Sequence, residues 1–194
     1  MNGRFIDVEA TALAVARRLD ECGIPHALGG ALAYNYYGVP RATGDVDFNV
    51  FLSVEDGRRT LECLTDLGIS VSPPVLAQLD REWQVRVDLD GRFVDLFFAY
   101  HPFHQSCRER ATRRPFGDGD VAVLSAEDLV VFKTIFNRTR DWADIERLFQ
   151  VQGTRFDIAY ALRWLDDILG PDDSSRMRLA NLYGGATGAT SPTP

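Results

Sequence analysis

Residues 29–50 constrain this chain more than any other segment, because they place two charged side chains inside an apolar run. The segment reads GGALAYNYYGVPRATGDVDFNV, with Asp45 and Asp47 one residue apart beside Val46 and Phe48. Bulky apolar residues at this density are typical of a covered central strand. Carboxylates rarely lie in such a strand without a partner, so the two acids need an explanation.

The spacing of the two acids predicts a cation site. Residues i and i+2 of a strand point to the same face, about 6.6 Å apart, so Asp45 and Asp47 aim at one place. Two carboxylates held together are costly unless a cation lies between them, and Mg²⁺ prefers oxygen ligands of this kind. Asp95, within RFVDLFF, is a third acid on a later strand. Three carboxylates from two strands could hold two metal ions about 3.5–4 Å apart, an arrangement used for phosphoryl transfer.

A pair of glycines precedes the acids. Gly29 and Gly30 stand between a short expected strand, HAL, and a helix-like run, ALAYNYYG. Glycine lets the backbone approach a phosphate closely, and a helix N-terminus offers free N–H groups and the positive end of a dipole. Together, the glycines and the acids predict a triphosphate on the glycine turn with metal ions on the carboxylates.

Local patterns elsewhere predict strands first and helices later. Two alternating runs, WQVRVDLD and RFVDLFFAY, flank the pair Asp90-Gly91, which predicts a tight β-hairpin. Ser125 with Asp128 forms a predicted capping box at the start of the helix AEDLVVFKTIFN. The runs RDWADIERLFQ and FDIAYALRWLDDIL continue as expected helices.

We therefore expect an α/β (α+β) fold: a short mixed β-sheet flanked by helices, followed by a helical part. The expected core covers residues 1–104, and a mainly helical C-terminal part over residues 105–183 packs on it. The low-complexity tail at residues 184–194 is expected to be disordered.

Composition limits the class of protein. A chain of 194 residues with 45% hydrophobic and 25% charged residues and a net charge of −7 is an ordinary globular domain. The acidic balance argues against a protein whose main role is to coat nucleic acid. An arginine cluster, described by RERATRR at residues 108–114, is either a solvated face or a local patch for RNA.

The cysteines and the apolar runs indicate the cellular compartment in which the protein is expected. Three widely spaced cysteines without a CxxC pattern predict neither a disulfide framework nor a zinc site, and favour a reducing compartment. No run has the length of a membrane span or the flanks of a signal peptide. We expect a cytoplasmic protein with no membrane partner.

The motifs, taken in order, resemble those of a known superfamily. The succession LGG, RATGDVDF and VDLF is similar to the DNA polymerase β-type nucleotidyltransferases. Within that superfamily, RATGDVD together with LSAEDLVVFKTIFNRTRDWADIERL resembles the AbiEii/MenT-like toxin nucleotidyltransferases, over residues 24–150. The resemblance implies the nucleotidyltransferase fold, an NTP such as ATP as substrate, and two Mg²⁺ ions.

The resemblance also implies a role for each matching residue. The glycines Gly29 and Gly30 would hold the phosphates, and Asp45, Asp47 and Asp95 would bind the metals. Four further groups would contact or support the nucleotide: Arg41, Thr43, Lys133, and Asp141 or Asp144. Lys133 would also count among the catalytic residues with the three acids. Gly30 departs from the pattern, because many relatives carry a serine there.

Each motif also has a purely structural interpretation. The two acids of the strand could cap a neighbouring helix. Lys133 lies on an apolar helix face, where a lysine often extends its amine to solvent. Asp141 and Asp144 are spaced i and i+3 and could belong to a solvated, ion-paired face. His101 and His104 form an HxxH pair without a third metal ligand.

Three functions are compatible with these motifs. The first is transfer of a nucleotide to a tRNA end by a toxin that has a cognate antitoxin. The second is transfer to a small molecule, such as an aminoglycoside, or to a protein hydroxyl. The third is a nucleotide-binding antitoxin or regulatory module that does not turn over.

Overall fold

A computed structural model describes residues 8–187 of the chain, which fall into two compact units. Unit 1 contains residues 8–32 and 42–124, and unit 2 contains residues 33–41 and 125–187. The expected boundary after residue 104 lies inside unit 1. The division into a core over residues 1–104 and a separate C-terminal part stays a prediction.

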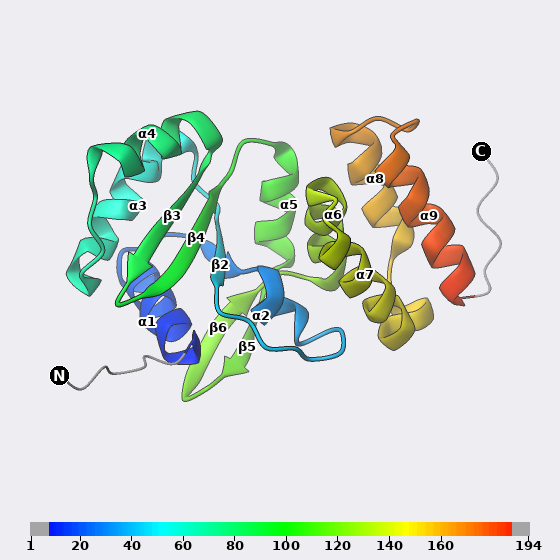
Figure 1. Cartoon of the computed structure of the whole chain (residues 1–194), viewed down its shortest axis with the longest axis horizontal. Helices are drawn as coiled ribbons and strands as arrows, with labels where there is room; N and C mark the ends of the chain where they lie inside the picture. Colours follow the sequence, from blue (N-terminus) through cyan, green and yellow to red (C-terminus); the bar gives the residue numbers. More distant parts are fainter. Residues whose placement is uncertain (1–7, 188–194) are drawn as a thin grey trace. The chain divides into compact units, whose positions relative to one another are not determined.

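Unit 1 is built on one mixed sheet whose strands run in the order β3-β4-β2-β1-β6-β5 (Figure 1). The central strand β2 pairs in parallel with β4 and antiparallel with β1, and β1 is parallel to β6. The expectation of a short mixed sheet flanked by helices is confirmed. The strands are β1 His26–Leu28, β2 Val46–Val50, β3 Gln84–Leu89, β4 Arg92–Phe98, β5 Thr112–Phe116 and β6 Gly119–Val123.

The predicted hairpin joins β3 to β4. Asp90 and Gly91 both have positive φ angles, of 51° and 82°, as a two-residue turn that matches the strand twist requires. The turn fixes the register of the two strands, and this register places Arg86 opposite Asp95.

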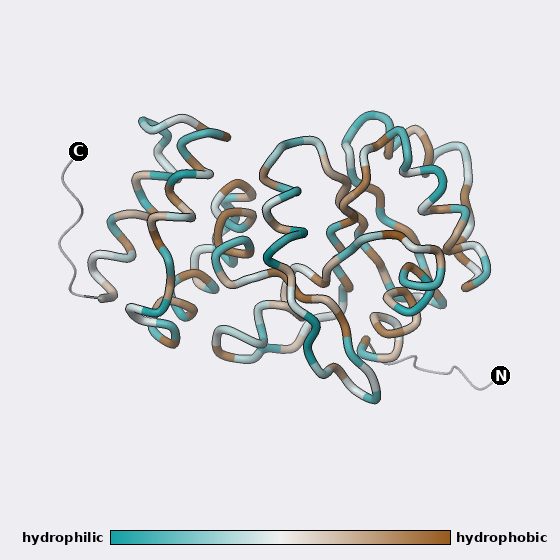
Figure 2. Tube along the Cα trace, turned by 180° about the vertical axis from the view of Figure 1, so that it is seen from behind, coloured by the Kyte–Doolittle hydropathy of each residue, from teal (hydrophilic) through white to brown (hydrophobic). Residues whose placement is uncertain are grey.

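The central strands have one deeply buried face. On that face, apolar side chains from β2, β3 and β4 alternate with the more accessible residues of the other face. Helix α1, Val8–Glu21, packs on β1, β2 and β6 and also on α3, Gly57–Leu64. The buried side chains include Val46, Phe48, Val50, Val85, Val87, Val94, Leu96 and Phe98. Figure 2 shows hydrophobic and hydrophilic residues alternating along the helices, as expected of helices that bury one face.

The helix after the glycine pair is shorter than expected. Helix α2 covers only Gly30–Tyr34, because the Asn35 side chain bonds the backbone N–H and C=O of Arg41 and closes a turn there. Helix α3 is flanked by two 3-10 turns, Val54–Asp56 and Thr65–Leu67.

The arginine-rich stretch forms two elements that the sequence did not indicate. Helix α5, Pro102–Arg110, precedes β5, which is an edge strand of the sheet. Charged residues and proline on an edge strand discourage pairing with another chain, which accounts for Arg113, Arg114 and Pro115 there. Arg113 also forms an ion pair with Asp20, at 3.1 Å.

A disulfide links Cys22 to Cys63, so the prediction of no disulfide is wrong. The two residues are 41 positions apart in the sequence, and the packing of α1 on α3 brings their Cα atoms to 6.4 Å. That separation is within the usual range for a bridge. The free thiol of Cys107 is buried.

Unit 2 is mainly helical in its described part, apart from residues 35–41. Ser125 accepts a hydrogen bond from the N–H of Asp128 at 3.1 Å, which confirms the predicted cap of α6. Its helices are α6 Ala126–Phe136, α7 Thr139–Gln152, α8 Ile158–Ile168 and α9 Ser174–Thr187, with a 3-10 turn at Gly153–Arg155.

The last described residues are helical. Helix α9 includes residues 184–187 of the tail that was expected to be disordered, and residues 188–194 lie outside the described residues. Between residues 8 and 187, no helix combines the length and the apolar character needed to cross a bilayer.

Candidate functional site

Asp47 and Asp95 lie side by side on the accessible face of the sheet in unit 1. The parallel pairing of β2 with β4 makes them direct partners in register, and both side chains are half-buried. Asp45 comes just before β2 and is also half-buried. The hydroxyl of Thr43 accepts a hydrogen bond from the backbone N–H of Asp45 at 3.3 Å, so Thr43 braces the chain before the strand.

The glycine turn touches the same acids. The N–H of Gly29 donates to the backbone oxygen of Asp47 at 2.8 Å. Gly30 has a φ of +52°, and a Cβ placed on it would lie 1.9 Å from Oδ2 of Asp47. Only glycine fits this position, because any side chain would displace the carboxylate. The turn and Asp47 are therefore in direct contact, as the order of the motifs suggested.

Arg86 is a site residue that sequence reasoning missed. Its Nε donates to Oδ1 of Asp95 at 2.8 Å and its Nη2 donates to Oδ2 at 2.7 Å, a bidentate pair. The guanidinium also lies over the ring of Phe93, with 5.1 Å between Cζ and the centroid. The signal was present in the sequence, because the Asp90-Gly91 turn fixes the strand register that pairs the two residues.

All three acids raise the pKa of Arg86. Hydrogen bonding to Asp95 raises the pKa of the Arg86 guanidinium, and the negative charges of Asp45 and Asp47 add to this rise. This agrees with a concentration of negative charge on this face of the sheet.

The donor chemistry fits a hard cation only in part. Within residues 8–187, no three histidine, cysteine or acidic side chains form a cluster arranged to hold a metal ion. Asp45 and Asp47 offer the carboxylate oxygens that Mg²⁺ prefers. Both oxygens of Asp95 already accept hydrogen bonds from Arg86. The two acids before and within β2 thus have the ligand chemistry that suits such an ion, and Asp95 has Arg86 as a counter-ion.

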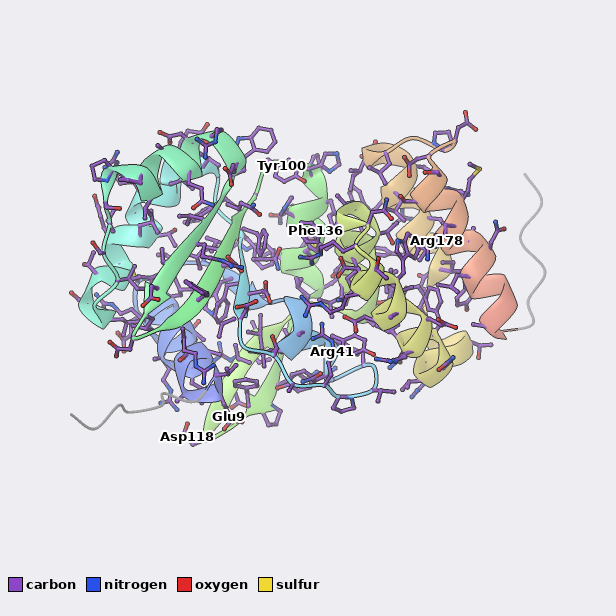
Figure 3. The ribbon with its side chains drawn as sticks, in the orientation of Figure 1. Glu9, Arg41, Tyr100, Asp118, Phe136 and Arg178 are labelled. Carbon is purple, nitrogen blue, oxygen red and sulfur yellow. A yellow bond between two sulfur atoms is a disulfide. The ribbon has the colours of Figure 1, made fainter. Side chains whose placement is uncertain are left out.

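A second charged cluster lies in unit 2. Asp144, 1% exposed, accepts hydrogen bonds from Nε and Nη2 of Arg41 at 3.0 and 2.9 Å and from Nζ of Lys133 at 2.7 Å. Lys133 is also 3.4 Å from Asp141, which bonds Arg138 in the cap of α7. Figure 3 labels Arg41, which reaches this cluster from the segment after α2.

The cluster lies against an aromatic ring, and hydrogen bonds within it stabilise the charged forms of its residues. The Arg41 and Lys133 head groups lie 5.9 and 5.5 Å from the centroid of the Tyr34 ring. Burial would raise the pKa of Asp144, but hydrogen bonds from Arg41 and Lys133 outweigh it and hold this pKa below its ordinary value. The hydrogen bonds to Asp144 also raise the pKa of Arg41.

The exposed fractions of Asp141, Asp144 and Lys133 test the structural interpretations of these three residues. The idea that Asp141 and Asp144 form a solvated face is wrong, because they are 2% and 1% exposed. Lys133 does not extend to solvent either, since it is 6% exposed and ion-paired. The nucleotide contacts expected from Arg41, Thr43, Lys133, Asp141 and Asp144 stay predictions.

The two histidines of the HxxH pair serve the fold of unit 1. The His101 side chain caps α5 by accepting from the N–H of Phe103 at 3.2 Å. The His104 ring lies 4.8 Å from the ring of Tyr100 and is 2% exposed. This burial lowers the pKa of His104 to about 4.

The sheet order, the glycine turn and the paired acids define a class, that of proteins with the nucleotidyltransferase fold, and comparisons of structure agree. The crystal structure of ANT(2'')-Ia with adenylyl-2''-tobramycin has a TM-score of 0.55 at 12% identity, covering 90% of this chain and 98% of that one. A candidate nucleotidyltransferase from H. pylori has a TM-score of 0.50 at 16% identity, covering 93% of both chains. No protein-family model matches the sequence, and a search of curated proteins finds no significant match. The chain therefore has the nucleotidyltransferase fold.

Proposed function

We propose that this protein transfers a nucleoside monophosphate from an NTP to an acceptor, with Mg²⁺ as cofactor. One observation carries the proposal: Gly30 contacts Asp47, and Asp47 lies opposite Asp95, on the accessible face of a nucleotidyltransferase-type sheet. A glycine turn beside paired carboxylates can receive both the phosphates and the ion that compensates their charge.

The proposed reaction is attack of an acceptor oxygen on the α-phosphorus of the NTP. The new bond joins that oxygen to phosphorus, the bond between the α-phosphorus and its bridging oxygen breaks, pyrophosphate leaves, and the acceptor proton passes to a base. Bound Mg²⁺ neutralises charge on the phosphates and on the departing pyrophosphate. Asp45 and Asp47 hold the ion in this proposal, and Gly29 and Gly30 leave room for the triphosphate. Asp95 completes the acid site.

A small-molecule hydroxyl is the first acceptor to test. ANT(2'')-Ia, the neighbour with the TM-score of 0.55, is complexed with adenylyl-2''-tobramycin, a nucleotidylated small molecule. The net charge of −7 also favours a cationic or neutral acceptor over a polyanion.

An RNA acceptor is the second candidate, and two observations favour it. The RATGDVD motif resembles that of the AbiEii/MenT-like toxins, and the exposed residues Arg108, Arg113 and Arg114 lie on α5 and β5. A toxin of this kind would arrest growth when expressed, and Asp45→Ala would relieve the arrest. If RNA is the acceptor, we expect the protein to have a cognate antitoxin and to act in the cytoplasm, where NTPs are available.

The test is incubation with Mg²⁺ and each NTP labelled on its α-phosphate, in separate reactions with total RNA and with an aminoglycoside mixture. We expect label in an acceptor, and we expect Asp47→Asn to reduce it by about a hundredfold or more, because the ion supplies several kcal/mol of charge stabilisation. Asp118→Asn is the matched control: this acid, labelled in Figure 3, is 79% exposed and pairs only with the exposed Arg17 in the contacts described. NTP binding without label transfer to any acceptor would instead favour a non-catalytic nucleotide-binding module.

A further inference from the structure

We propose that Arg86 is a built-in cation of the acid site, so that the site takes one divalent ion rather than two. This inference rests on the proposed function, because it concerns the same carboxylates. It assigns Arg86 as a positioning residue that acts through Asp95. It also revises the expectation of two ions, which treated all three acids as metal ligands.

The first argument is geometric. The guanidinium plane meets the carboxylate of Asp95 edge to edge, with one donor on each oxygen at 2.8 and 2.7 Å. This bidentate form holds the carboxylate in one orientation, which a single hydrogen bond does not. Strand pairing supports the arrangement, because the backbone register already places Arg86 opposite Asp95 and the ring of Phe93 lies under the guanidinium. The arginine therefore reaches the acid without leaving its own strand.

The second argument is the location of this pair in the sheet. Asp95 has Arg86 opposite it on β3 and Asp47 opposite it on β2. The three side chains form a row across three neighbouring strands, with the arginine at one end and the acid that touches the glycine turn at the other. An ion that bridged Asp47 and Asp95 would have to share the oxygens that Arg86 occupies.

The third argument is the charge of Asp95. Its carboxylate already has the Arg86 guanidinium as counter-ion, with one hydrogen bond on each oxygen. A divalent ion brought to the same oxygens would meet the positive charge of the guanidinium, which would repel it.

The experiment counts bound Mn²⁺ ions by the electron paramagnetic resonance signal of the free ion during a titration of the full chain. We expect about one tight site per chain in the wild type, and about two in Arg86→Met, because the freed Asp95 can then join Asp47 as a ligand. Arg86→Lys keeps a positive charge beside Asp95 and should remain at about one. Arg81→Met is the matched control, because Arg81 pairs with Glu82 on the exposed surface of α4 and should leave the count unchanged.

The outcomes separate this inference from the proposed function. Two tight ions in the wild type, or one ion in a folded Arg86→Met protein, would overturn the role of Arg86 and leave nucleotidyl transfer standing. No bound Mn²⁺ in any of the variants would contradict the acid site itself, and with it the proposed function. A structural ion pair that only stabilises the hairpin predicts a lower melting temperature for Arg86→Met without a change in the ion count. If Arg86→Met does not fold, a wild-type count of two still refutes the proposal.

Discussion

Replacing Asp144 by asparagine tests the buried cluster of unit 2. Asp144 is 1% exposed and accepts three hydrogen bonds, two from Arg41 and one from Lys133. The amide has nearly the same shape but no charge, so two cations lose their common counter-ion. The remaining ion pair of Lys133 is the longer contact of 3.4 Å with Asp141.

The expected cost is large. Hydrogen bonds to charged groups contribute about 1.5–3 kcal/mol each, but the three bonds of Asp144 are not independent. Removing one partner from a buried ion pair typically costs about 3–5 kcal/mol, so we take about 4 kcal/mol for Asp144→Asn. With a urea slope of about 2 kcal/mol per molar, the midpoint should fall by about 2 M.

The assay is urea unfolding at pH 7, followed by tryptophan fluorescence, with Asp166→Asn as the control. Asp166 also pairs with an arginine in unit 2, Arg176 at 2.6 Å, but it is 37% exposed. Its loss should cost less than about 1 kcal/mol, because solvent screens the pair. A midpoint shift for Asp144→Asn no larger than that of Asp166→Asn would refute the reasoning.

The pH dependence supplies a second signature of the same cluster. The folded pKa of Asp144 is lower than its ordinary value, so its contribution is fully present above the unfolded pKa of about 4. That contribution is lost as the pH falls through the folded pKa. The difference between wild type and Asp144→Asn should therefore be constant near neutral pH and shrink only in strong acid.

Three further predictions concern unit 1. His104 has a folded pKa of about 4 against an ordinary 6.5, so the unfolded chain takes up its proton first; stability should fall by about 3 kcal/mol as the pH drops from 6.5 to 4, and His104→Gln should flatten this part of a urea-unfolding pH profile. Opening the disulfide by Cys22→Ser should cost about 4 kcal/mol for its 41-residue separation, measured as a lower melting temperature that reductant does not change further; a wild type insensitive to reductant would contradict it. Gly30→Ala should abolish Mn²⁺ binding by displacing Asp47, whereas Gly68→Ala carries a similar positive-φ strain of about 1–2 kcal/mol in open space and should bind normally.

Local patterns sufficed for the elements that hold the acids. The bulky run around Asp47 predicts the central strand, and the Asp90-Gly91 pair predicts the hairpin that carries Asp95. These signals depend on neighbours in the sequence, so no knowledge of the tertiary packing is needed. The motif order then indicates that the glycine turn meets the acids, and the contact of Gly30 with Asp47 agrees with that order.

Contacts between residues that are far apart in the sequence were harder to predict from local patterns. The bridge between Cys22 and Cys63 depends on how two helices pack, and no local pattern records it. The burial of Asp144 likewise depends on Arg41, 103 positions away in the chain. Arg86 is intermediate between these cases. The register of the hairpin predicts that Arg86 lies opposite Asp95, but the spacing of the two residues in the sequence does not by itself indicate a pair. The solvated alternative for Asp144 fails because its counter-ion Arg41 is distant in the sequence and no local pattern indicates the pair.

The segment at residues 33–41 makes the two units hard to separate by cutting the chain. This segment belongs to unit 2 but lies in the sequence between the two ranges of unit 1. Within unit 2, Arg41 bonds Asp144, and the side chain of Gln152 donates to the backbone oxygen of Tyr37 at 2.7 Å. A protein truncated after residue 124 would keep this segment and lose its partners, and an isolated helical part would lack the arginine that bonds Asp144. Exchange of the C-terminal helices between related proteins would therefore need a second, internal exchange at residues 33–41. Recombination at a single crossover should give poorly folded chimeras, whereas two matched replacements should restore them.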